Sequence, residues 1–305
     1  MFKPTKINKF KTIISLLLIL IITFFAFYPS LNNGFTNWDD YTYITENPVI
    51  QSLSLLNFRK IFASFFLTNY QPVTILSYLI EYRLFKLNPF GYHLTNLILH
   101  LLNCLLVFWL IFLLTGRVSI SWVTTILFGI HPLQVESVAW ISERKNVLYA
   151  FFFLGSLISY LYYLVGKKEL KYYFFCLFLF ILSLLSKSMA VTLPLAMFLM
   201  DYLFCRKPDK SMFLEKIPFF ILSLIFGVIA IFGAHSSGNI RQESSYSLFS
   251  IFALSSYIVA FHLNKIFLPF RLSCFYPYDG MQNFTVYLYS IVTMVILSSG
   301  VIISG

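Results

Sequence analysis

Charged side chains are scarce in this chain: Asp, Glu, Lys and Arg make up 11% of its 305 residues, and only 12 residues are acidic. Soluble domains carry about 25% charged residues, so this composition excludes an ordinary water-soluble protein. Hydrophobic residues instead reach 59%, with a mean hydropathy of +0.79. The sequence predicts an all-α, polytopic integral membrane protein.

Cysteine is also scarce. None of the four cysteines forms a CxxC pair, and Cys104 and Cys176 lie within apolar runs, which excludes a disulfide framework and a cysteine-based metal cluster. The net charge of +10 does not indicate nucleic acid, because the basic residues lie between apolar runs rather than on a soluble basic face. We therefore expect no nucleic-acid partner.

Long apolar runs dominate what remains. A hydrocarbon layer about 30 Å thick needs roughly 20 apolar residues per helix, and this criterion predicts about nine spans in one membrane domain over residues 1–305. They are 12–31, 92–114, 118–138, 146–165, 171–186, 189–204, 217–234, 248–268 and 285–305. The first run could instead be a cleaved signal peptide, but residues 27–30 offer no small-x-small cleavage site, which favours an uncleaved anchor.

Lysine and arginine predict the orientation. A cytoplasmic N terminus places 14 of the 22 basic residues in short cytoplasmic segments, as the positive-inside rule expects. The same alternation places a first outer loop, about residues 32–91, on the other side, together with residues 131–146 and Lys187. The outer face is therefore where we look for chemistry.

The first outer loop begins with Asn37-Trp38-Asp39-Asp40. Adjacent carboxylates raise one another's pKa when partly buried, which suits a base or a cation site, although the pair could also be a simple turn or helix cap. Further along, Pro72 predicts the start of a helix that runs through Phe85. Its polar residues favour a helix lying along the membrane interface over a spanning one.

A polar stripe follows on the second span, where His93, Asn96, His100 and Asn103 recur at steps of three and four, on one helix face. Hydrogen bonding between helices explains such a stripe, and so does a wet, functional cavity. The sequence favours the first explanation and leaves His93 as a candidate substrate contact.

The richest group of chemical side chains lies between His131 and Asn146. If Pro132 opens one continuous helix, Glu136, Trp140 and Glu143 share a face, and Arg144 and Lys145 can bind an anion. A second outward cation, Lys187, lies in a short turn between spans. Structural explanations also stand: Trp140 as an interfacial anchor, Arg144 and Lys145 paired with Glu143, and Lys187 reaching toward headgroups.

These segments together resemble a known family. Asn37-Trp38-Asp39-Asp40, Tyr70-Gln71-Pro72, residues 88–93, the run 131–148 and residues 185–194 are similar to the membrane domain of the transmembrane-and-tetratricopeptide-repeat O-mannosyltransferases and their bacterial relatives, of the GT-C class. The resemblance covers roughly residues 12–210. Ser188 stands where the family pattern has proline, and tetratricopeptide repeats are absent from this chain, so a downstream soluble or repeat region is an expectation only.

The resemblance implies a GT-C-like bundle that moves a sugar from a polyprenyl-phosphate donor to a protein or glycan hydroxyl, with inversion, on the outer face of a bacterial inner membrane or in the ER lumen. It implies Asp39 as general base with Asp40 assisting. Arg144, Lys145 and Lys187 would bind the donor phosphate. Gln71, His93, His131, Glu136, Trp140 and Glu143 would contact substrate. No cofactor is certain, and a divalent cation on Asp39 and Asp40 stays open.

Two alternatives remain. A transporter or flippase of lipid-linked sugars would also carry outer carboxylates, but the chain lacks paired, Gly- or Pro-interrupted spans in two matching halves. A non-catalytic membrane scaffold has little use for ionisable groups clustered on one face. Asp39 far from both Arg144 and Lys187 would argue against an enzyme.

Overall fold

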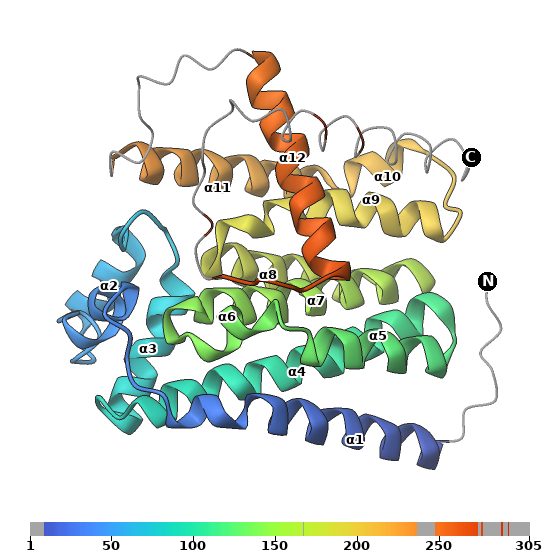
Figure 1. Cartoon of the computed structure of the whole chain (residues 1–305). Helices are drawn as coiled ribbons and strands as arrows, with labels where there is room; N and C mark the ends of the chain where they lie inside the picture. Colours follow the sequence, from blue (N-terminus) through green and yellow to red (C-terminus); the bar gives the residue numbers. More distant parts are fainter. Residues whose placement is uncertain are drawn as a thin grey trace. The chain divides into compact units, whose positions relative to one another are not determined.

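A computed structural model describes residues 9–166, 168–236 and 248–273, with the isolated positions 276, 288 and 292. The chain divides into two compact units, Met1–Ile240 and Arg241–Gly305. The described residues form helices and no β-sheet, which confirms the expected all-α membrane bundle (Figure 1). The helices of the first unit are α1 (Lys9–Phe27), η1 (Tyr28–Asn32), η2 (Tyr41–Thr45), α2 (Leu55–Ala63), α3 (Pro72–Phe85), α4 (Pro89–Thr115), α5 (Val118–Ile130), α6 (Gln134–Ala139), η3 (Ile141–Glu143), α7 (Arg144–Val165), α8 (Leu170–Ser186), η4 (Ser188–Thr192), α9 (Leu193–Leu203), α10 (Lys210–Leu214) and α11 (Ile217–Ser236), and α12 (Leu248–Phe267) belongs to the second.

Local sequence explains where the long helix α4 begins and ends. The Asn88 side chain accepts a hydrogen bond from the Phe90 backbone N at 3.1 Å, and Pro89 supplies the first residue. At the other end Gly116 has a φ of 65°, a left-handed conformation that suits glycine. The 27 residues of α4 extend about 40 Å, enough to cross a bilayer core.

Four helical segments among the described residues are long and apolar enough to span a membrane. They are Phe10–Asn32, Pro89–Thr115, Ile141–Val165 and Lys210–Ser236. Each matches a predicted span. Shorter apolar helices lie at Leu170–Ser186, Ser188–Leu203 and Ile251–Phe267, where three more were predicted. The predicted span 285–305 lies outside the described residues.

The predicted span 118–138 is wrong in its extent. α5 ends at Ile130 after 13 residues, and the separate six-residue helix α6 follows. His131 precedes Pro132, and its backbone is extended, with ψ of 133°. A residue before proline is driven out of the helical region by the proline ring, so the apolar run cannot continue as one helix.

The first outer loop contains the short helix η2 and two α-helices, α2 and α3, and α3 begins at Pro72 as predicted. One face of α3 is buried in the first unit. The Thr74 hydroxyl donates to the Ser186 carbonyl at 3.0 Å, and the Tyr78 hydroxyl donates to the Ile141 carbonyl at 2.9 Å. The loop is therefore packed onto the ends of α7 and α8 rather than held apart from them.

The polar stripe of α4 joins helices to one another. Asn96 and Asn103 donate to the carbonyls of Trp140 and Val147 at 3.0 and 2.8 Å, and a ring nitrogen of His100 lies 2.9 Å from the Gly129 carbonyl. All of these side chains are buried. The interhelical explanation of the stripe is confirmed for these three residues.

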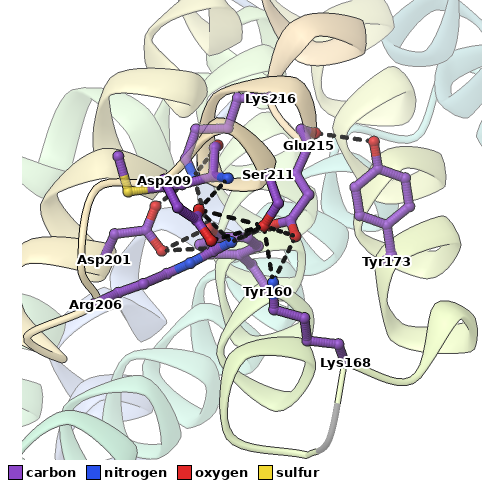
Figure 2. A network of polar contacts seen from close by, with 10 residues as sticks. Tyr160, Lys168, Tyr173, Asp201, Arg206, Asp209, Ser211, Glu215 and Lys216 are labelled. Carbon is purple, nitrogen blue, oxygen red and sulfur yellow. Dashed lines mark hydrogen bonds and ion pairs between the residues drawn. The ribbon is translucent and has the colours of Figure 1, made fainter.

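A charged network ties the far ends of α7 and α9 to the start of α11 (Figure 2). Lys216 is fully buried and pairs with Asp201, while the Tyr160 hydroxyl donates to Asp201 at 2.8 Å and accepts from Lys216 at 2.9 Å. Arg206 pairs with Glu215 at 2.7 Å. Each charge has an opposite charge beside it, as burial near lipid requires.

We expect Asp201→Asn to destabilise the protein, because Lys216 would be left buried without its counter-charge. Removal of one partner from a buried ion pair costs about 3–5 kcal/mol. Thermal unfolding of the purified, detergent-solubilised protein measures the change. The double variant with Lys216→Met should regain much of the lost stability, and Lys171→Ala, which breaks an exposed pair with Glu169, should leave it unchanged. An Asp201→Asn protein that melts with the wild type would contradict this role.

Candidate functional site

Asp40 is fully buried and surrounded by hydrogen-bond donors. One of its oxygens accepts from the backbone N and the hydroxyl of Thr36, at 2.8 and 3.1 Å. The other accepts from the Trp140 indole N and the Ser142 backbone N, both at 3.1 Å, and from the Ser142 hydroxyl. This carboxylate therefore joins the start of the first outer loop to a turn 100 residues later in the chain.

That turn links α6 to α7 and is held from three sides. Trp140 has an extended backbone, with ψ of 122°, and η3 follows it. Asn96 donates to the Trp140 carbonyl and Tyr78 to the Ile141 carbonyl. The expectation of one helix with Glu136, Trp140 and Glu143 on a shared face is therefore wrong, because α6 ends at Ala139 and the chain bends before α7 begins.

Asp39 differs sharply from its neighbour. Its side chain is 35% exposed, and the Lys145 Nζ lies 3.8 Å from its carboxylate. Lys145 also pairs with Glu143 at 2.8 Å and lies 5.6 Å from the centre of the Tyr43 ring. The structure thus brings Asp39 beside one predicted cation, and leaves its carboxylate accessible where Asp40 is closed off.

Lys187 is linked through Asn146 to Glu143, the partner of Lys145. Its Nζ donates to the Asn146 amide oxygen, and the Asn146 amide nitrogen donates to Glu143. Burial lowers the pKa of Lys187, an effect that Glu143 and Glu136 oppose. Partial burial and then the nearby Glu143 raise the pKa of Glu136. Lys187 is therefore a partly buried cation bound to a neutral amide rather than in a direct ion pair.

Arg144 lies elsewhere and is fully buried. It forms a two-pronged ion pair with Glu81 at 2.9 Å, and its remaining N–H groups donate to Asn96, Ser77 and the Tyr92 carbonyl. All five donors of the guanidinium are used. The expectation that Arg144 binds a phosphate does not fit these surroundings; it fastens α3 and α4 to the start of α7.

Three further predicted substrate contacts have different positions. Gln71 is buried, and its side chain lies close to the Tyr43 hydroxyl. His93 is also buried, close to the loop that precedes Asp39. His131 accepts a bond from the Leu133 backbone N at 3.2 Å, within the turn between α5 and α6. Gln71 therefore lies near Tyr43, the residue whose ring Lys145 approaches. His131 instead stabilises the turn between α5 and α6.

Sequence patterns did not identify several residues that complete the site. Thr36 and Ser142 donate hydrogen bonds to Asp40. Asn146 links Lys187 to Glu143 through its amide. The Tyr43 ring lies beside the Lys145 ammonium. Asn146 lay inside the polar run already noted, so its position was visible but its partner was not. Within the described ranges no three His, Cys, Asp or Glu side chains are grouped to hold a metal ion.

We expect Asp40→Asn to destabilise the protein far more than Asp39→Asn. An amide at position 40 would turn an NH2 group toward donors, and a buried donor left unsatisfied costs about 1–3 kcal/mol, or more near charge. The Asp39 side chain is 35% exposed, so its conversion to Asn should change the free energy of unfolding by about 0.5 kcal/mol or less. Thermal unfolding in detergent compares the two, and equal melting temperatures would refute the structural role of Asp40.

The chain is similar in sequence to several protein O-mannosyl-transferases. The chain is 29% identical over 210 residues to protein O-mannosyl-transferase F38B6.6 of Caenorhabditis elegans, covering 63% of this chain and 29% of that protein. It is 35% identical over 112 residues to protein O-mannosyl-transferase Tmtc3 of Drosophila melanogaster and 33% over 92 residues to human TMTC3. These two matches cover 30% of this chain and 12% and 10% of the relatives. No family model and no solved structure matches.

Proposed function

Because this chain is a member of the same family as the TMTC protein O-mannosyl-transferases, we propose that it is an integral-membrane glycosyltransferase. It moves a sugar from a polyprenyl-phosphate donor to a hydroxyl of a protein or glycan acceptor. The observation that carries the proposal is the contact between Asp39 and Lys145, with Lys187 joined to the same group. The chain spans less than a third of the relatives it matches, so their substrates are part of the proposal.

Asp39 acts as the general base. Of the adjacent aspartates it alone has a carboxylate open to an incoming hydroxyl, since Asp40 is surrounded by protein donors. A placed base typically contributes about 10² to 10⁴ in rate. Asp40 is then a positioning residue, which holds Asp39 near Lys145 through the bonds of its own carboxylate to Ser142.

Lys187 and Lys145 stabilise the departing phosphate. Fixed cations where negative charge develops lower the barrier because they need not reorganise during the reaction. The positive charge of Lys145 is partly neutralised by its ion pair with Glu143. Lys187 contacts the neutral Asn146 amide, so its positive charge attracts the phosphate more strongly. Arg144 takes no part in phosphate binding, since Glu81 already neutralises it.

The reaction is a single displacement. The acceptor oxygen forms a bond to the anomeric carbon as its proton passes to Asp39, and the bond from that carbon to the phosphate oxygen breaks with its electron pair leaving on the phosphate. The anomeric configuration inverts. A divalent cation is not assigned, because Asp40 is fully buried and both of its oxygens already accept hydrogen bonds from protein donors.

The site lies on the outer face, with the N terminus in the cytoplasm. The group around Lys145 lies at the start of α7 and the network around Tyr160 lies near its end, so one helix separates them. That second network contains Lys168, Arg206 and Lys216, basic residues that the positive-inside rule assigns to the cytoplasmic side. Their separation by a spanning helix supports this orientation.

Asp39→Asn should lower turnover of a polyprenyl-phosphate hexose by about 10² or more, because an amide cannot take the proton. The measurement uses purified, detergent-solubilised protein with a peptide rich in Ser and Thr, with and without EDTA. Asp39→Asn should keep wild-type stability and should lower turnover far more than donor affinity, which separates chemistry from folding and binding.

Unchanged turnover in Asp39→Asn would remove Asp39 from the mechanism. Donor binding and release without any product, in the wild type, would favour the transporter alternative. A wild type that neither binds the donor nor turns it over would support the scaffold alternative. Full loss of turnover in EDTA, restored by a divalent cation, would add a metal to the proposal.

Donor affinity should weaken at alkaline pH, and earlier than for an ordinary lysine. The pKa of Lys187 is lowered from 10.5, and its ammonium binds phosphate only below that pKa. Affinity is therefore full at neutral pH and falls as pH rises through the lowered value. Binding of a short-chain polyprenyl-phosphate hexose across pH 7–10.5 tests this.

The control variants are Lys187→Arg and Lys187→Met. Arginine keeps its charge throughout the range, so Lys187→Arg should flatten the alkaline loss, while Lys187→Met should weaken binding at every pH. An alkaline loss that persists in Lys187→Met would show that another group titrates.

A further inference from the structure

Trp38 is the residue before the proposed base, and this large aromatic residue is 54% exposed. Asp39, the next residue in the chain, has its carboxylate 3.8 Å from the Lys145 ammonium. Lys145 also pairs with Glu143 at 2.8 Å. Exposed aromatic rings are usually scattered or face lipid. Here the exposed ring contacts Trp140, whose indole N donates to Asp40.

The ring is also held in place. Trp38 contacts Trp140 edge to face, with ring centroids 5.6 Å apart and planes at 65°. Trp140 is itself fixed, because its indole N donates to Asp40 and its carbonyl accepts from Asn96. The chain Asp40–Trp140–Trp38 thus pre-orients an exposed indole, and a pre-oriented ring loses little conformational entropy when a ligand binds it.

We propose that Trp38 is the platform that contacts the pyranose ring of the donor sugar, an inference that rests on the proposed function and names the ligand of that site more closely. A pyranose has a face of C–H groups and an edge of hydroxyls. The indole offers an apolar surface for the C–H face, and Asp39 and Glu143 offer acceptors for the hydroxyls. The sugar is therefore held beside the base, while the phosphate meets Lys187.

Trp109 provides a matched control. It is also an exposed tryptophan, at 46%, and its indole N donates to the Tyr162 hydroxyl at 3.0 Å on the α4 and α7 pair. The partner of the Trp109 indole N is therefore Tyr162 rather than Asp39, Glu143 or Lys145. Loss of either ring removes a similar apolar surface, so a general membrane-anchoring effect would appear in both variants.

The experiment compares two carriers, a short-chain polyprenyl phosphate with a hexose and the same polyprenyl phosphate without one. Trp38→Ala should weaken binding of the hexose-loaded carrier about 5- to 10-fold, the size of a favourable aromatic contact. It should leave the bare carrier unchanged. Trp38→Phe should keep most of the affinity, and Trp109→Ala should change neither carrier.

Equal weakening for both carriers would overturn the inference, because the ring would then contact the phosphate or the lipid. So would unchanged binding of both, or a lower melting temperature in Trp38→Ala with no change in sugar selectivity, the behaviour of an interfacial anchor. A wild type that binds both carriers while Asp39→Asn turns over normally would refute the proposed base and leave this test intact. A wild type that binds neither would overturn both proposals.

Discussion

The buried Asp40 carboxylate joins two of the segments from which the candidate site is made. It accepts hydrogen bonds from Thr36 in the first outer loop and from Trp140 and Ser142 before α7. An ionised carboxylate away from water is stable only when donors replace its hydration. The demand for those donors fixes the loop against the turn. Asp39 and Lys145 belong to these segments, so their contact depends on the same bonds.

Adjacent residues of identical chemistry thus have opposite roles. Asp40 points into donors and becomes structural, while Asp39 keeps an accessible carboxylate. Arg144 and Lys145 are both buried and differ instead in their partners. Arg144 pairs with Glu81, whereas Lys145 lies between Asp39 and Glu143. The partly exposed Asp39 carboxylate therefore lies against a buried set of ion pairs and hydrogen bonds.

Two groups of paired charges lie near the two ends of α7. At one end are Asp39, Glu143 and Lys145, and at the other Asp201 and Lys216. Between them the core is made of Leu, Phe, Tyr and Met side chains. Charged groups in hydrocarbon are costly, so ionisable side chains gather at the helix ends. At one end the charges neutralise one another, and at the other an accessible carboxylate and an amide-bound lysine remain.

Hydropathy and periodicity determined the membrane class, the spans of α1, α4, α7 and α11, the start of α3 at Pro72 and the hydrogen-bonding stripe of α4. These depend on residues near one another in the chain. Only the tertiary structure decided that α5 stops before Pro132, that Arg144 pairs with Glu81, and which aspartate stays accessible. A carboxylate takes its role from the donors that surround it, and for Asp40 those donors come from 100 residues away. Such partners are set by packing, which no local pattern records.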